Sequence, residues 1–367
     1  MKKKILFLLH IPPPIHGSSI MGQEIKNKFI INNSFECRFL NLLVNQKINE
    51  SGKFKFVKLI QFCRIIFRLL LEIITERPDV CYFALTTTGI ALYKDTVLVA
   101  LLRLLRIERI YHLHNKGVSM NNTSKINNKL YRFVFSGANI ILLSNFLYYD
   151  IEAFVPFSRV HICPNGITHI KNKINSLRLQ NDAPVRILFL SNLIESKGVY
   201  ILLEACKLLA NKKMEFICSF AGSIGNVSEK DFNEKVQQLE LENKVKYMGV
   251  QYGLEKELSL VNTDIFVHPS YHDCFPLVLL EAMQYSLPVV STFEGGIPDL
   301  VENGVTGYLV PQKNAEALAD KLEILIKNPE LRAQMGKAGR IKFENEFTLD
   351  IFEHRLNEIL HKILEKQ

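Results

Sequence analysis

The chain has 367 residues, of which 48% are hydrophobic and 22% are charged, and its formal net charge is +8. This length and apolar content predict two domains rather than one. No apolar run reaches the roughly 18 residues of a transmembrane helix. The seven scattered cysteines form no Cys-x-x-Cys pair, which argues against a zinc site or a disulfide framework and is typical of a reducing compartment.

The charge is divided unevenly along the chain. Residues 1–180 carry 25 Lys and Arg against 10 Asp and Glu, whereas residues 181–367 carry 20 against 27. A basic first half is expected to meet an anionic partner, such as nucleic acid, a membrane surface or a phosphorylated substrate.

Short apolar runs alternate with helix-length amphipathic segments, which predicts parallel sheets covered by helices on both faces. The start, "MKKKILFLLHIPPP", resembles a signal peptide, but its short apolar stretch ends at three prolines and favours a first buried strand. The predicted strands are 5–9, 79–85, 109–114 and 138–144 in the first half, and 185–191, 215–222, 244–249, 264–270 and 287–292 in the second.

The polar stretch 168–184 is the best candidate for a linker. We therefore expect two doubly wound α/β domains, 1–170 and 182–346, followed by an amphipathic helix at 347–367 that returns to the first domain. Ligands of such domains bind beyond the carboxyl ends of the strands, so a shared ligand would lie in a cleft that the domains face. The first strand-to-helix loop, "HIPPPIHGSS", offers Gly17 and two serines to a phosphate or a sugar, which by itself is a weak signal.

The segment 53–76 predicts a mostly apolar helix with a narrow polar stripe. One interpretation buries the helix against the sheet with only the stripe in water. The other rests the helix on anionic lipid through Lys53, Lys55, Lys58 and the phenylalanines.

In the second half, a helix is predicted to begin at Pro276, since proline suits the first helical position. Phe275 then stands at the N-cap and has no side-chain acceptor, so the amides of Leu277 and Val278 stay free for an anion. Asp273 precedes this helix and Glu281 lies more than a turn inside it.

These two acids are therefore expected to reach different parts of one ligand. The alternative is a buried helix with two incidental acids.

Lys197 at the start of an earlier helix is placed to pair with phosphate oxygens. Paired glycines in "FEGGIPDLV" (293–301) are expected where a ligand approaches the backbone closely.

The motifs "HPSYHDCFPLVLLEA", "FEGGIPDLVENGVTGYLV" and "ICPNGI" resemble those of the retaining glycosyltransferases of family 4, which have the two-Rossmann GT-B fold. The resemblance covers nearly the whole chain and is strongest over 185–310. The hallmark of that family is two glutamates with seven residues between them, and Asp273 and Glu281 occupy their places. The resemblance implies that Glu281 holds the ribose of a nucleotide-sugar, Asp273 faces the donor sugar, and the 275–278 amides bind the diphosphate.

Two positions depart from the pattern of the family. Asn192 stands where an arginine is usual, which removes a cation for the diphosphate. Asp273 replaces a glutamate and reaches less far. The segment "IYHLHNKG" resembles the family segment whose histidine points toward the donor sugar, which implies His114 as a catalytic residue, with His112 as the alternative.

The implied reaction moves a sugar from a nucleoside diphosphate donor, UDP favoured and GDP the alternative, to an acceptor hydroxyl on a lipid-linked or growing surface glycan. No metal is expected, since the sequence has no Asp-x-Asp motif of the kind that holds Mg²⁺ on a diphosphate. We also expect no cofactor and no nucleic-acid partner. Its expected location is cytoplasmic, either free or peripheral on the inner face of the membrane.

Three other functions are alternatives: a nucleotide-sugar epimerase of the same fold, a degenerate nucleotide-sugar-binding protein, and a dehydrogenase. The absence of Gly-x-Gly-x-x-Gly after either first strand weakens the dehydrogenase.

Overall fold

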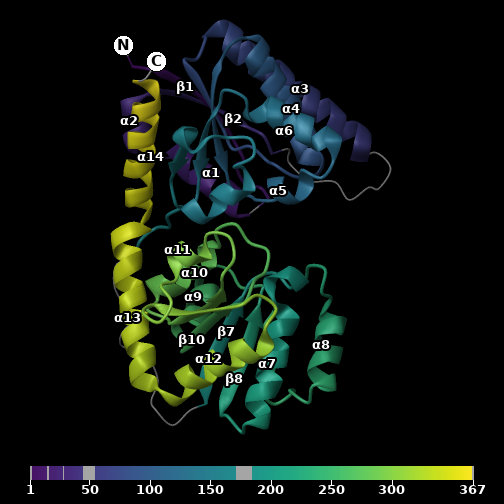
Figure 1. The fold of residues 1–367 in the computed structure, drawn as a ribbon, viewed down its shortest axis with the longest axis vertical. Coiled ribbons are helices and arrows are strands. Elements are labelled where there is room, and N and C mark those ends of the chain that lie inside the picture. The colour runs from purple at the N-terminus through teal and green to yellow at the C-terminus, as the bar shows by residue number, and fades with distance from the viewer. Residues whose placement is uncertain (1, 15, 28, 44–53, 171–183, 366–367) are drawn as a thin grey trace. The chain divides into compact units, whose positions relative to one another are not determined.

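The computed structural model describes residues 2–14, 16–27, 29–43, 54–170 and 184–365. The chain divides into two compact units, of which unit 1 comprises residues 1–165 and 350–367, and unit 2 comprises residues 166–349. Figure 1 shows that each unit is a sheet with helices on its faces. The predicted α/β class with two Rossmann-like domains is confirmed.

Unit 1 contains a six-stranded parallel sheet in the order β2-β1-β3-β4-β5-β6. Its central strands are apolar on both faces, and Phe7, Tyr82 and Tyr111 are fully buried between the layers. The strands are β1 (Lys4–Leu9), β2 (Glu36–Asn41), β3 (Val80–Phe83), β4 (Glu108–Leu113), β5 (Asn139–Leu142) and β6 (Val160–Ile162).

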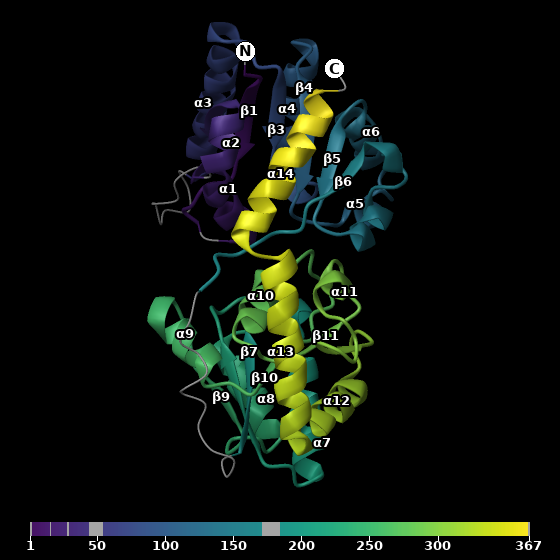
Figure 2. The same cartoon turned by 90° about the vertical axis from the view of Figure 1, so that its left-hand side faces the viewer.

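The helices of unit 1 come from both ends of the chain. The last one, α14, packs on unit 1, where Glu353 Oε1 accepts a hydrogen bond from the Ile30 amide at 2.7 Å and the His361 ring contacts Phe35 (Figure 2). The helices are α1 (Gly17–Asn27), α2 (Phe29–Ser34), α3 (Phe54–Thr75), α4 (Gly89–Leu104), α5 (Val118–Asn121), α6 (Lys125–Phe135), the 3-10 helices η1 (Asn145–Asp150) and η2 (Phe157–Arg159), and α14 (Leu349–Leu364).

Unit 2 contains a second six-stranded parallel sheet in the order β12-β11-β10-β7-β8-β9. Its core gathers Phe189, Phe216, Phe220 and Phe232. The strands are β7 (Val185–Leu190), β8 (Phe216–Ala221), β9 (Val245–Tyr247), β10 (Ile265–His268), β11 (Val289–Thr292) and β12 (Gly307–Val310). The helices are η4 (Glu195–Lys197, 3-10), α7 (Val199–Asn211), α8 (Glu229–Gln238), α9 (Gly253–Val261), α10 (Leu277–Gln284), α11 (Ile297–Leu300), α12 (Ala315–Lys327) and α13 (Pro329–Glu346).

The helix predicted at 53–76 is α3, and the interpretation that only its polar stripe meets water is wrong. Phe67 and Ile74 are 62% and 75% exposed. The side chains of Lys53, Lys55 and Lys58 lie outside the described residues. No helix in the described part of the chain combines the length and apolarity needed to cross a membrane.

Candidate functional site

The helix α10 begins where the loop after strand β10 ends, at the carboxyl edge of the second sheet. Pro276 is its N-cap, with φ −72° and ψ 112°, and Leu277 is its first helical residue. The prediction that Phe275 is the N-cap was wrong by one residue. The ring of proline fixes φ at a value that suits both the N-cap and the first helical position, but the ψ of Pro276 is extended, which makes Pro276 the N-cap. No side chain caps the first turn, so the amides of Leu277 and Val278 stand at the positive end of the helix dipole.

Glu281 lies one turn further along α10 and is only partly paired. Its Oε1 accepts a hydrogen bond from Lys256 Nζ at 2.8 Å. Its Oε2 is buried, and no donor from the described residues reaches it. A buried carboxylate oxygen without a donor is costly, by about 1–3 kcal/mol or more. The arrangement can therefore accept hydrogen bonds from a ligand.

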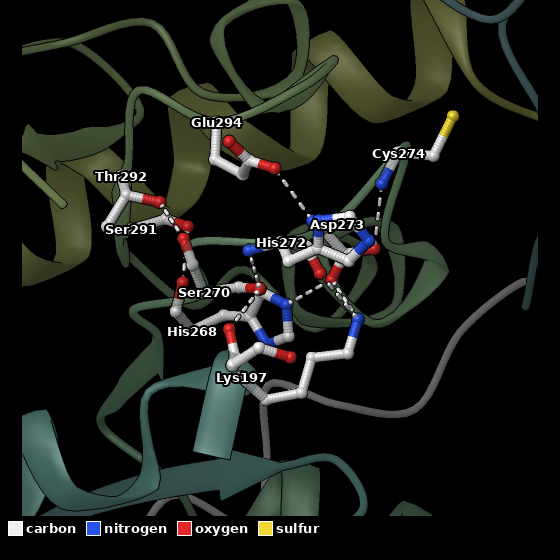
Figure 3. Close-up of polar contacts among 10 residues, drawn as sticks. Lys197, His268, Ser270, His272, Asp273, Cys274, Ser291, Thr292 and Glu294 are labelled. Atoms are coloured by element: carbon white, nitrogen blue, oxygen red, sulfur yellow. Dashed lines mark hydrogen bonds and ion pairs between the residues drawn. The ribbon is translucent and has the colours of Figure 1, made fainter. Parts of the chain in front are cut away.

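Asp273 has a full set of partners within unit 2, which Figure 3 shows. Its Oδ2 lies 2.6 Å from Lys197 Nζ and 2.9 Å from His268 Nε2, and its Oδ1 accepts from the Cys274 amide at 3.1 Å. Burial by itself would raise the pKa of the Asp273 carboxyl. The hydrogen bond from His268 and the ammonium of Lys197 outweigh it and hold the pKa well below its usual value. Asp273 is therefore ionised at neutral pH.

The two acids of the sequence motif thus have separate partners and are not a pair that shares a proton. Lys197 lies in the 3-10 turn that precedes α7, and it contacts Asp273 and the carbonyl oxygen of His272. Asn192 follows β7, and its Oδ1 accepts from the Ser223 amide at 3.3 Å, which joins two neighbouring loops at the same edge of the sheet.

Glu294 is a residue that the sequence reasoning missed. It is buried, and its Oε1 accepts a hydrogen bond from the Asp273 amide at 2.8 Å (Figure 3). Its Oε2 accepts from Gln312 Nε2 at 2.6 Å. A Cβ on the neighbouring Gly295, whose φ is +52°, would lie 2.3 Å from the Asp273 carbonyl oxygen. We expected a ligand to approach the backbone closely at the paired glycines. At Gly295 it is the backbone of Asp273 that makes this close approach.

His268 was also missed. It is the last residue of β10 and lies in the quoted motif "HPSYHDCFP", so the available signal was its place at the end of a buried strand.

In unit 1, the predicted residues lie at the carboxyl edge of the first sheet. Gly17 begins α1, and a Cβ there would meet nothing within 4 Å. His114 directly follows β4 and is half-buried, and its Nδ1 is buried without a partner among the described residues. Burial, helped by His10 and His16, lowers the pKa of His114 to about 3, so its ring is neutral.

His112 is a core residue. It is fully buried within β4, and its Nδ1 shares a hydrogen bond with the hydroxyl of Tyr82. Its ring centroid lies 4.2 Å from that of His114. Of the two histidines, His114 is the one that remains partly exposed to a ligand.

Comparisons with known proteins agree with this architecture. Residues 170–342 match the family described as glycosyl transferases group 1. The amylovoran biosynthesis glycosyltransferase AmsK of Erwinia amylovora is 30% identical over 270 residues, which cover 71% of this chain and 66% of that protein. The putative colanic acid biosynthesis glycosyltransferase WcaL of Escherichia coli is 32% identical over 188 residues, or 49% of this chain and 46% of that protein. The chain thus spans between about half and two thirds of these relatives.

Among solved structures, HepE of Anabaena in complex with UDP superposes with a TM-score of 0.74 at 20% identity. The match covers 98% of this chain and 100% of HepE. A likeness at this identity indicates a shared fold.

Proposed function

Because the chain belongs to the group 1 glycosyl transferases, we propose that it moves a sugar from a nucleoside diphosphate sugar to an acceptor hydroxyl with retention of anomeric configuration. The observation that carries the proposal is the buried Oε2 of Glu281, which receives no hydrogen bond from the described residues. It lies one turn inside a helix whose first turn is capped by none of the described side chains. A nucleoside diphosphate has a partner for each of these two features. Its ribose hydroxyls can donate hydrogen bonds to the Glu281 carboxylate, and its diphosphate can bind the amides of the helix N-terminus.

In this proposal Glu281 accepts from the ribose, and the amides of Leu277 and Val278 bind the diphosphate together with Lys197. The ammonium of Lys197 is already neutralised in part by Asp273 at 2.6 Å. A diphosphate therefore competes with Asp273 for this cation. The arginine that is usual in the family is replaced by Asn192, so Lys197 carries a larger share of the leaving-group charge.

The reaction needs stabilisation of two developing charges. The bond from the anomeric carbon to the diphosphate oxygen breaks, the acceptor oxygen attacks on the same face, and the diphosphate oxygen takes the acceptor proton. The α10 amides and Lys197 stabilise the leaving diphosphate. The ionised carboxylate of Asp273 stabilises the positive charge that develops on the sugar. The neutral ring of His114 forms a hydrogen bond with a sugar hydroxyl, either as donor or as acceptor.

UDP is the proposed nucleotide, because structures of HepE with UDP, with UDP and glucose, and with UDP-glucose share this fold. The proposed acceptor is a lipid-linked or growing surface glycan, by analogy with the polysaccharide-biosynthesis relatives. We propose that the enzyme acts at the cytoplasmic face of the membrane. This location agrees with the basic first half of the chain, which is expected to meet an anionic partner.

A pocket of about 400 Å³ in unit 1 supports an acceptor site there. It lies where β1, β2 and β3 end, which is the ligand edge of such a sheet. The buried carboxylate of Asp95 accepts from the Thr86 amide through Oδ2, and it can also accept from an acceptor hydroxyl. The lining residues are His10, His16, Leu42, Leu43, Phe62, Ile65, Thr86, Ala91, Lys94, Asp95 and Leu98.

The test is calorimetric titration of the protein with UDP, GDP and UDP-sugars, followed by NMR of the glycoside formed with the donor that binds. We expect UDP to bind more tightly than GDP, and the product to keep the anomeric configuration of the donor. An inverted product would exclude the proposed mechanism. Conversion of the donor sugar without acceptor would favour the epimerase, and binding without turnover would favour a binding protein.

A further inference from the structure

The helices α3, α4 and α6 of unit 1 lie side by side and form one layer on the sheet (Figure 1). Arg77, just after α3, donates through Nη2 to the carbonyl oxygens of Leu105 and Arg106, just after α4, at 2.9 and 3.1 Å. The Tyr93 hydroxyl on α4 donates to Asn127 Oδ1 on α6 at 3.0 Å. We refer to the outer side of α3, α4 and α6 as the helical face.

The helical face exposes an unusual number of large apolar side chains. Phe67 and Ile74 of α3 are joined by Ile90 and Leu104 of α4, which are 80% and 78% exposed. Single exposed apolar residues are normal on a soluble protein, but here two or more are exposed on each of three adjacent helices, which indicates an interaction surface. The remaining members are Leu59, Ile60, Leu71, Tyr93, Val97, Ile126 and Phe133.

The exposed charges of the helical face all have one sign. Among the described side chains of this face, the exposed charged ones are Arg64, Arg68, Lys94, Lys125, Lys129 and Arg132. The carboxylates on the described side chains of these helices are withdrawn from the surface, since Asp95 is buried and half-buried Glu72 is paired with Arg38 at 2.9 Å. The face therefore combines apolar contact area with uncompensated positive charge.

We propose that the helical face binds the surface of an anionic lipid bilayer. A second copy of the chain would bring two sets of cations together, which disfavours self-association through this face. The cores of protein interfaces are depleted of charge, with polar groups at the rim. On α3, by contrast, Arg64, Phe67, Arg68 and Leu71 alternate. Such mixing suits a bilayer interface, where apolar side chains enter the acyl boundary while Lys and Arg reach lipid phosphates.

This surface is larger than the lipid contact predicted from the sequence, which comprised Lys53, Lys55, Lys58 and the phenylalanines of one helix. It includes α4 and α6 as well as α3. It does not depend on the proposed sugar transfer, because lipid binding can be measured without donor or acceptor. A failure of either proposal leaves the other testable.

The experiment is flotation of the full chain with vesicles of phosphatidylcholine containing phosphatidylglycerol, and with vesicles of phosphatidylcholine alone, at low and high salt. Two double variants change the face, Phe67→Ser with Ile74→Ser and Arg64→Glu with Arg68→Glu. Two matched double variants change exposed residues of unit 2, Leu254→Ser with Ile341→Ser and Lys230→Glu with Lys337→Glu. Thermal unfolding of each variant checks that it is folded.

We expect the wild type to float with the anionic vesicles and to be released as salt rises, because salt screens the attraction. Each cation removed should weaken partition about fivefold, and both variants of the helical face should lose binding while both unit 2 variants keep it. Equal flotation with neutral vesicles, or unchanged flotation of the folded face variants, would overturn the proposal. So would a lipid-free dimer that the face variants dissociate, since the face would then be a protein interface.

Discussion

Replacing Asp273 by asparagine removes one charge from the cluster with Lys197 and His268 while keeping its shape. The side chains of Asp273 and Lys197 are only 12% and 23% exposed, so water screens their 2.6 Å contact little. Hydrogen bonds between charged groups contribute about 1.5–3 kcal/mol, more than an exposed ion pair does. We therefore expect Asp273→Asn to lower the free energy of unfolding of unit 2 by about 2 kcal/mol at neutral pH.

The dependence on pH follows from the lowered pKa of Asp273. A carboxyl whose pKa is lower in the folded than in the unfolded protein stabilises the fold fully above its unfolded pKa, and this contribution is lost as the pH falls toward the folded pKa. The unfolded value is near 3.8. The difference in stability between wild type and Asp273→Asn should be constant at neutral pH and should narrow only below about pH 4.

The assay is a double-mutant cycle by urea unfolding, with Asp273→Asn, Lys197→Met and the double variant. We expect a coupling energy of about 1.5–3 kcal/mol. The control cycle uses Lys230 and Glu234, an exposed pair 3.7 Å apart, for which we expect coupling close to zero. If both cycles give equally small coupling, the cluster does not hold Lys197, and our account of the site is wrong.

Three further changes test the site. Glu281→Ala should weaken UDP binding by about 1.5–3 kcal/mol in calorimetry, because the ribose hydroxyls lose their acceptor; unchanged affinity would exclude Glu281 from the nucleotide site. Asn192→Arg should tighten binding of the UDP-sugar or leave it unchanged, and weaker binding would mean that the contact of Asn192 with the Ser223 amide shapes the site. Gly295→Ala should destabilise the protein by about 1–3 kcal/mol in urea unfolding, since its φ is +52° and its Cβ would meet the Asp273 carbonyl; wild-type stability would show that the loop relaxes easily.

The sequence predicted the buried strands better than the edge strands. The strands that it missed, β2, β6 and β12, all lie at sheet edges. Edge strands can be covered less completely than central ones and then lack the continuous apolar run that marks a buried parallel strand. In β2, for example, residues 36–39 alternate charged and apolar side chains, and the strand is mostly half-buried. The strand β12 is short, with only four residues.

The sequence could name candidate positions for the site but not the contacts between them. Glu281 and Lys197 were named as candidates because helix starts and spacing are local properties of the sequence. The contact of Glu294 with the Asp273 amide joins residues 21 apart, and that of Lys197 with Asp273 joins residues 76 apart. Such contacts depend on how the strands are ordered in the sheet, which periodicity alone does not specify.

Because α14 packs on unit 1, it affects the order in which the two units can complete their folding during synthesis. Domains usually fold as they leave the ribosome, the first one first. Here the amide of Ile30 has its acceptor at Glu353, and Phe35 has its ring contact at His361, so both wait until the whole of unit 2 has been synthesised. Unit 2 is encoded by one uninterrupted stretch and can complete its fold earlier. The packing of α14 on unit 1 is therefore completed last, and a fragment that stops at residue 165 leaves the partners of α14 uncovered.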